Sequence, residues 1–193
     1  MKCFIFLYPL QEIINLEINN HSYGQDEGEG AFRQKCKKYL NRIIDARYRK
    51  NGFAVHWAVF DDCAISDIID VRPADKIIKV GLDFKTHTTK QTDGTFPYPS
   101  PDFILNQLGE AAVIRIAGFH MWDCVEKLAK RAYEREFDTL VDEDLTEFFF
   151  WRIKDRGFKI DEYPSFNPRE IGEIMFGEFM KARRERPWLW QNY

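Results

Sequence analysis

The chain has 193 residues, of which 45% are hydrophobic and 31% are charged. This length suits a single α/β domain, and this composition excludes a disordered protein. The 28 basic residues are balanced by 31 acidic ones, so the formal net charge of −3 gives no electrostatic footprint for nucleic acid. Aromatic residues make up 16% of the chain, and its 17 phenylalanines predict a Phe-rich core.

Five apolar segments alternate with helical segments along the chain. The strands are expected at 3–8, 53–60, 76–80, 112–117 and 137–141. The helices are expected at about 31–50, 101–108, 124–133, 145–156 and 167–184, with polar loops at 18–30 and 83–101. Such alternation predicts a three-layer α/β/α fold with a doubly wound, mostly parallel sheet. We expect one domain, 1–193, with a C-terminal helix and an aromatic tail at about 167–193.

The cysteines and the N-terminal residues indicate in which cellular compartment the protein is expected. The four cysteines, at positions 3, 36, 63 and 124, show no C-x-x-C spacing and do not cluster with the histidines. We therefore expect no disulfide framework, no zinc site and a reduced, cytoplasmic protein. The apolar run at 3–10 contains Pro9 and lacks a small-residue cleavage site after it, so we interpret it as a strand. The sequence has no run of 18 apolar residues, so no membrane span is expected.

The C-terminal region has a helix start and an aromatic end. Asn167 is suited to cap the helix and Pro168 to occupy its first turn. Basic and aromatic residues mix in the tail, which could stack on nucleic acid, but the charge balance gives no support for this. We interpret Trp188, Leu189 and Trp190 as a docking or dimer contact.

Cys124 is the residue most suited to chemistry. The strand at 112–117 ends in Gly118, and Cys124 follows six residues later, near the start of a helix. Ligands of parallel sheets bind at the carboxyl ends of the strands. Helix N-terminal amides favour an anion, so this position predicts a lowered thiol pKa and a place for an oxyanion. The alternative is a buried, small apolar residue.

The stretch GFHMWDCVEKLAKRAYEREFDTLVDED, at 118–144, resembles the nucleophile region of the isochorismatase-like cysteine hydrolases. That family includes nicotinamidases and carbamoylsarcosine amidases. Its pattern is a strand ending in Gly, a short turn, Cys-Val opening an Ala-containing helix, and a strand ending in acids. The matching positions are Gly118, Cys124, Val125, Ala129, Ala132 and Asp144. The resemblance extends more weakly over most of the chain. It implies the family's doubly wound parallel sheet and, with Cys124 as nucleophile, hydrolysis of a small amide or ester.

The proton-transfer residues differ from the family pattern. Family members carry Asp-x-Gln after the first strand, whereas this chain has Pro9 and Gln11. Because proline cannot accept a proton, another group must serve as the base. His120, four residues before Cys124, has a suitable intrinsic pKa. The family's lysine lies on or after a middle strand, where Lys79 is the candidate, with Lys85 as an alternative.

Four residues near the same strand ends are expected to line the substrate site: Tyr8, Phe119, Trp122 and Asp123. Tyr8 also suits a core aromatic, and Asp123 suits a helix cap. We expect no cofactor and no metal. The residues that would form a metal site show no recognised ligand spacing: His56, Asp61, Asp62 and His87.

Three functions remain open. A divergent cysteine hydrolase requires a base within reach of Cys124 and an open cavity. An inactive relative, acting in ligand binding or assembly, should have that space filled by Trp122, Phe119 or Tyr8. A redox sensor should have an exposed thiol with a low pKa. A small-molecule ligand and a homo-oligomer are the expected partners; a nucleic acid and a membrane are not.

Overall fold

The computed structural model describes residues 1–20, 29–142, 145–147 and 185–189. Its centre is one five-stranded sheet with the order β3-β2-β1-β4-β5, in which every pair of neighbours is parallel. The strands are β1 (Lys2–Leu7), β2 (Ala54–Val59), β3 (Lys76–Lys79), β4 (Val113–Gly118) and β5 (Asp138–Val141). All five predicted strands are confirmed, and the doubly wound parallel sheet with them.

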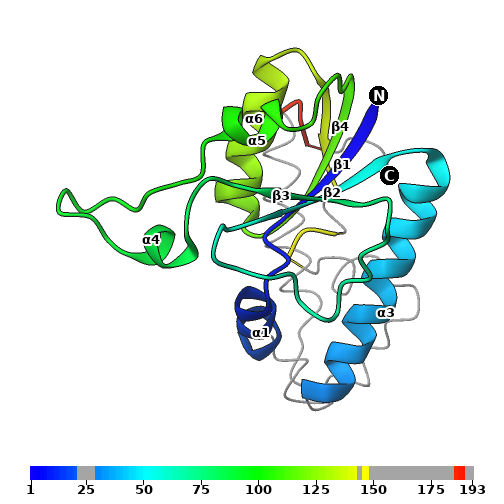
Figure 1. Ribbon diagram of the computed structural model, residues 1–193, viewed down its shortest axis with the longest axis horizontal. Helices are drawn as coiled ribbons and strands as arrows, with labels where there is room; N and C mark the ends of the chain where they lie inside the picture. Colours follow the sequence, from blue (N-terminus) through cyan, green and yellow to red (C-terminus); the bar gives the residue numbers. More distant parts are fainter. Residues whose placement is uncertain (21–28, 143–144, 148–184, 190–193) are drawn as a thin grey trace.

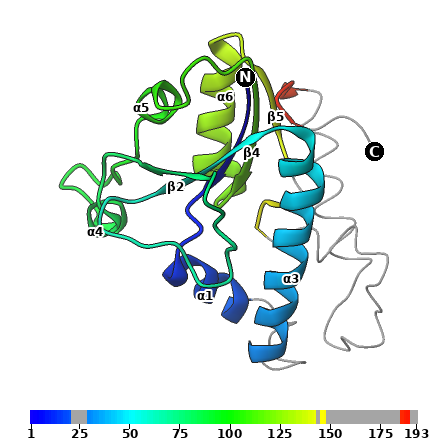
Figure 2. The ribbon, with the colours of Figure 1, turned by 45° about the vertical axis from the view of Figure 1, so that its right-hand side comes forward.

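Helices lie on both faces of this sheet, which confirms the three-layer α/β/α fold (Figures 1 and 2). The helices α5 (Pro101–Asn106) and α6 (Glu126–Glu134) pack together on one face, and α3 (Glu29–Arg47) covers the other. The remaining helical elements are α1 (Gln11–Asn20), a 3₁₀ turn (Arg49–Asn51), α4 (Phe84–Thr88) and a π-helical turn (Met121–Val125).

Helix α1 was not predicted, and its residues 18–20 were expected to be a loop. Leu10, Ile13 and Ile14 are buried, at the i, i+3 and i+4 spacing of one helix face. This face packs toward α3 and the core. The spacing was hidden because these residues follow directly on the apolar run of the first strand.

The predicted Phe-rich core forms around β1. Cys3 to Leu7 are all fully buried, as expected for a central strand covered on both faces. On one face of β1 the ring of Phe4 stacks on Tyr48, with 3.9 Å between centroids. Phe6 lies on the same face, and it meets Phe4 edge-on at 6.4 Å and Phe119 edge-on at 5.9 Å.

The strand order reverses at β1, between its neighbours β2 and β4. Ligand crevices in such sheets form at this switch point, beside the carboxyl ends of the strands. Gly118 ends β4 there with φ of 123°, and a Cβ at this position would lie 2.2 Å from the carbonyl oxygen of Leu7. Only glycine allows the two strand ends to approach so closely.

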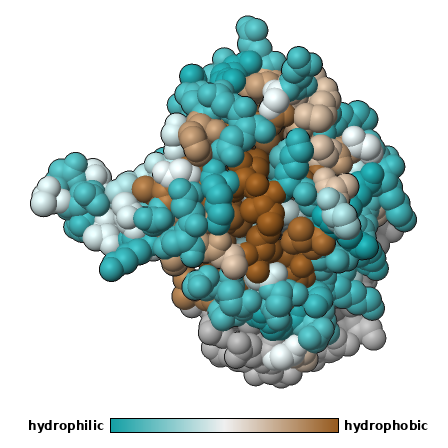
Figure 3. Space-filling model, in the orientation of Figure 1, coloured by the Kyte–Doolittle hydropathy of each residue, from teal (hydrophilic) through white to brown (hydrophobic). Residues whose placement is uncertain are grey.

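Residues 84–97, in the predicted polar loop, form an arm that projects from the body and contains α4 (Figures 1 and 3). Aromatic contacts fix its base. The His87 ring stacks on Phe60 at 5.0 Å, and Tyr98 meets His87 edge-on at 5.2 Å.

The C-terminal residues 185–189 dock on their own chain. Leu189 forms a parallel bridge with Val141, whose amide donates to the Trp188 carbonyl at 2.8 Å. Trp188 and Leu189 are buried, so the docking interpretation of these two residues is confirmed. Trp190, Asn167, Pro168, the predicted helix at 167–184 and most of that at 145–156 lie outside the described residues. No helix in the described ranges is long and apolar enough to span a membrane.

Candidate functional site

A small cavity lies beside the carboxyl end of β1, at the switch point of the sheet. Its volume is about 10 Å³, which is room for about one water molecule. The residues that line it come from β1, the base of the arm, α5 and the segment after β4: Leu7, Tyr8, Tyr98, Pro99, Pro101, Ile104, Cys124, Lys127 and Leu128.

Cys124 is the fourth residue of the π-helical turn and is only 5% exposed. Burial, aided by the charge of Asp123, raises the pKa of its thiol to about 11. The predicted lowering of this pKa is therefore wrong. Hydrogen bonds from Tyr8 and from the His120 backbone lower this pKa, but by less than burial raises it. The next two amides are used elsewhere, because the Asp123 and Val125 N–H groups both donate to the carbonyl of His120, at 3.2 and 3.1 Å.

Tyr8 ends β1 with a left-handed φ of 58°, and its hydroxyl hydrogen-bonds the sulfur of Cys124. Its ring stacks on Phe60 with 4.6 Å between centroids. Burial, together with the nearby Cys124, raises the pKa of Tyr8 well above its usual value. The hydroxyl therefore keeps its proton and is the donor of the hydrogen bond to the sulfur. Tyr8 is both a core aromatic and a wall of the cavity.

Asp123, Lys127 and Tyr98 form a polar cluster beside the thiol. The Lys127 ammonium hydrogen-bonds the Asp123 carboxylate and lies 3.3 Å from the centroid of the Tyr98 ring. The Tyr98 hydroxyl also bonds Asp123, which raises the pKa of Tyr98. Although burial acts to raise the pKa of Asp123, its bonds with Lys127 and Tyr98 lower it overall. Asp123 is thus a paired carboxylate and a weak base.

The sequence interpretation missed Lys127 and Tyr98. Lys127 had a signal, because it lies four residues after Asp123 and three after Cys124, on one helix face. Tyr98 had no signal in the sequence, because its position depends on where the chain after the arm packs against the rest of the domain.

His120, Phe119 and Trp122 do not line the cavity. The His120 ring is half exposed, and its Nδ1 lies 3.8 Å from Glu147 Oε1. Phe119 is fully buried against the core. Trp122 is partly exposed, with the Arg186 guanidinium 5.3 Å from its ring centroid.

Lys79 also lies apart from the cavity lining. Its ammonium donates to the carbonyls of Phe60, Asp61 and Cys63 at 3.2, 3.2 and 3.1 Å. These bonds use all three of its N–H groups and hold the chain where it leaves β2. Lys85 lies exposed on the arm. Of the three predicted catalytic residues, the structure places only Cys124 in the cavity.

The residues considered as a metal site are separate. His56 is buried within β2, and His87 stacks on Phe60. The carboxylates of Asp61 and Asp62 accept backbone N–H bonds from residues 81 and 84. Across the described ranges, no group of three or more His, Cys, Asp or Glu side chains is placed to hold a metal ion.

No protein-family model matches this chain, and no curated protein matches it. Two similar solved structures are isochorismatase-family structures. The first, N-carbamoylsarcosine amidase from Thermoplasma acidophilum, is 15% identical with a TM-score of 0.46, over 79% of this chain and 92% of that one. The second, an isochorismatase family protein, is 14% identical with a TM-score of 0.45, over 75% of this chain and 80% of that one.

Proposed function

We propose that this chain is a non-hydrolytic binding subunit, in which Cys124 is a structural residue and the domain acts by associating with another chain. The observation that carries this proposal is the closed state of the thiol, which is buried, protonated and next to room for about one water.

The protonation of Cys124 opposes a role as nucleophile. With a pKa of about 11, only about one thiol in ten thousand is a thiolate at neutral pH. The groups next to the sulfur do not remove the proton of the thiol. Tyr8 is a donor, and Asp123 is paired with Lys127, which holds the lysine as an ammonium. Within the described residues, no side chain with a free basic site lines the cavity.

The space beside the sulfur also opposes hydrolysis. Pockets that bind small molecules measure roughly 300–1,000 Å³. The cavity of about 10 Å³, lined on one side by Tyr98, Pro99 and Pro101, is too small for an amide or ester. Tyr8 occupies part of the space beside the sulfur, which is the arrangement expected of an inactive relative.

One arrangement favours a second candidate, a cysteine hydrolase of small amides or esters. Lys127 and Tyr8 line the same cavity as Cys124, and the base of the arm supplies another wall. Displacement of Tyr98 would expose the thiol beside an ammonium. The thiol would then give up its proton, its sulfur would bond to the substrate carbonyl carbon, and the amine or alcohol would leave with that proton; water would then cleave the thioester, which releases the acid and restores the thiol.

The rate of alkylation of Cys124 as a function of pH separates the two candidates. Peptide mapping distinguishes Cys124 from the other three thiols, and Cys124→Ser is the control. We expect Cys124 to resist alkylation until the protein unfolds, and the native chain to match Cys124→Ser in screens of amides and esters. Rapid alkylation with an apparent pKa below the free-thiol value of about 8.5, with hydrolysis that Cys124→Ser abolishes, would establish the hydrolase instead.

A further inference from the structure

His56 is a titratable side chain that lies wholly inside the sheet. It is the third residue of β2 and is fully buried. It is paired with Ile5 on β1 and with Lys76 on β3. Ile5 shares a face of β1 with Leu7, which contacts α5 and α6 around the cavity. The His56 ring therefore lies on the face of the sheet that α5 and α6 cover.

The two nitrogens of this ring differ in their hydrogen bonding. Nδ1 lies 3.2 Å from the carbonyl oxygen of Ala54, so the tautomer that fits carries its hydrogen on Nδ1 and donates it there. Nε2 is buried and has no hydrogen-bond partner among the residues that the structure describes. In the neutral ring, Nε2 is an acceptor without a donor, which is a modest cost. In the protonated ring it would be an unpaired donor on a buried cation, which costs far more.

Burial and one neighbouring charge both oppose protonation of His56. Burial has the largest effect and lowers the pKa of the ring from its usual value of 6.5. The ammonium of Lys76 lowers this pKa further. The carbonyls of Ala54 and Phe4 and the carboxylate of Asp75 act in the opposite sense, and the pKa stays lowered.

The acidic groups of the surrounding elements are neutral or already paired. Asp75 is engaged with Arg49. On β1, burial raises the pKa of the Cys3 thiol, which therefore carries no charge at neutral pH. The acids of the covering helices α5 and α6 are each paired with an arginine: Asp102, Glu126 and Glu134. The core around His56 is thus built for an uncharged ring.

We propose that His56 is an acid-sensitive switch of this domain, because its ring fits the closed sheet only as the neutral imidazole. A state in which water reaches the ring takes up a proton at Nε2 when the pH falls below about 6.5. The closed state does not, so acid moves the population from closed to open. The outermost strand β3 offers the route, because it has only four residues and the first of them pairs with His56.

The lowered pKa determines the direction of the pH dependence. Above the unfolded-state value the ring is neutral in both states, and the fold has its full stability. As the pH falls from that value toward the folded-state value, the unfolded state binds a proton that the folded state does not. The equilibrium constant for unfolding then rises by at most tenfold for each pH unit, the limit for one proton. This range lies above the one in which most carboxyl groups titrate.

Urea unfolding of the full chain between about pH 7.5 and pH 5.5 tests this proposal. We expect the equilibrium constant for unfolding to rise by up to about tenfold over this range. His56→Leu and His56→Gln remove the titrating ring, and each should lose most of this rise. Val55→Ala is the matched control, because Val55 is buried beside His56 on β2 but does not titrate. It should be less stable at every pH and keep the native pH dependence.

Nuclear magnetic resonance measures the protonation of the ring directly. Comparison of the native chain with His56→Gln assigns the imidazole C–H resonance of His56. We expect this resonance to keep its position in the folded protein from about pH 7.5 to pH 5.5. A folded-state resonance that titrates at about pH 6.5, or His56 variants that keep the native pH dependence, overturns this inference.

The alkylation of Cys124 above about pH 7 is independent of these results, because there His56 is neutral in both states. A reactive, catalytic Cys124 would overturn the proposed function and leave the switch standing. An inert Cys124 in a chain whose stability does not depend on His56 protonation would do the reverse.

Discussion

The hydroxyl of Tyr8 donates a hydrogen bond to the sulfur of Cys124, which joins the end of β1 to the helical turn after β4. A thiol nucleophile needs a neighbour that removes its proton. Here the neighbour is itself a donor, held protonated by burial. The residue with the best position for chemistry is therefore integrated into the core at the switch point of the sheet.

Tyr8→Phe should raise the pKa of Cys124 still further, because the hydrogen bond from Tyr8 lowers it in the native protein. The free energy of unfolding should fall by about 1 kcal/mol, the usual value of one hydrogen bond. Alkylation at alkaline pH and urea unfolding measure the two effects. Tyr48→Phe is the control, since Tyr48 bonds Asp142 instead, and it should leave alkylation of Cys124 unchanged. Faster alkylation of Tyr8→Phe would show that Tyr8 acts as a shield rather than as a donor.

Tyr98→Ala should open the cavity, because Tyr98 forms one wall and anchors Asp123. We expect alkylation of Cys124 in the folded protein to become at least about tenfold faster, as expected when burial no longer limits access to a thiol. Phe96→Ala removes an aromatic ring from the nearby arm but not from the cavity, and should have no such effect. Equal rates in Tyr98→Ala and the native chain would show that another segment closes the site.

The fold was predictable because each strand is indicated by its own short apolar run in the sequence. The run at 3–8 reads as a strand without reference to any other residue, and the same holds for 53–60. Helix α1 was missed because Ile13 and Ile14 extend the apolar run, and only the turn at Tyr8 separates strand from helix.

The position of Cys124 was predictable from Gly118 and the helix that follows, whereas its chemistry was not. The thiol pKa depends on burial, and burial depends on Tyr8 and Tyr98, which come from distant parts of the chain. Lys79 illustrates the same limit, because its three carbonyl partners belong to the segment after β2. No pattern of spacing reports contacts of this kind.

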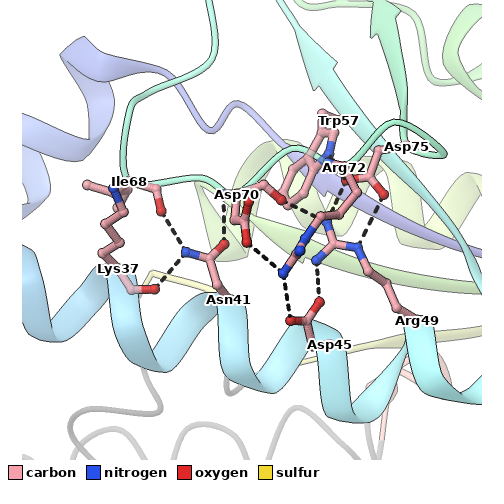
Figure 4. A network of polar contacts seen from close by, with 9 residues as sticks. All are labelled: Lys37, Asn41, Asp45, Arg49, Trp57, Ile68, Asp70, Arg72 and Asp75. Carbon is pink, nitrogen blue, oxygen red and sulfur yellow. Dashed lines mark hydrogen bonds and ion pairs between the residues drawn. The ribbon is translucent and has the colours of Figure 1, made fainter.

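A buried ion pair connects the 3₁₀ turn after α3 to the segment before β3 (Figure 4). The carboxylate of Asp75 accepts from Arg49 Nη2 at 2.5 Å and from the Trp57 indole at 2.9 Å. Arg49 also donates to Asp45 at 2.7 Å. Asp75 and Arg49 are both largely buried, so loss of the Asp75 charge leaves Arg49 with Asp45 as its remaining carboxylate partner.

Asp75→Asn should cost about 1–3 kcal/mol at neutral pH, the usual effect of losing hydrogen bonds to a buried charged group. Although burial acts to raise the pKa of Asp75, the hydrogen bond from Arg49 and others lower it below its usual value of 3.8. A group with a lowered pKa stabilises the fold fully above its unfolded-state value, and this contribution is lost as the pH falls toward the folded-state value. Urea unfolding of the native chain should therefore show stability falling below about pH 4, and Asp75→Asn should show a weaker fall.

The control for this variant is Asp70→Asn. Asp70 pairs with Arg72 at 2.7 Å, but both side chains are about half exposed. Its loss should cost less than about 1 kcal/mol. Equal costs for the two variants would mean that the Asp75–Arg49 pair contributes no more than a surface contact.

Gly118→Ala should be among the most destabilising single substitutions in the chain. The new Cβ would lie 2.2 Å from the Leu7 carbonyl oxygen and 2.6 Å from the Leu7 nitrogen, and both atoms belong to the paired central strand. We expect a loss of at least about 3 kcal/mol, since backbone must shift at φ of 123°. Gly52→Ala separates the strain of a left-handed backbone from the clash with Leu7. Gly52 has φ of 75°, but the space around it is open. It should cost only about 1–2 kcal/mol, the price of a left-handed backbone. Urea unfolding of both variants measures the difference, and similar losses would show that the close approach of β1 and β4 relaxes easily.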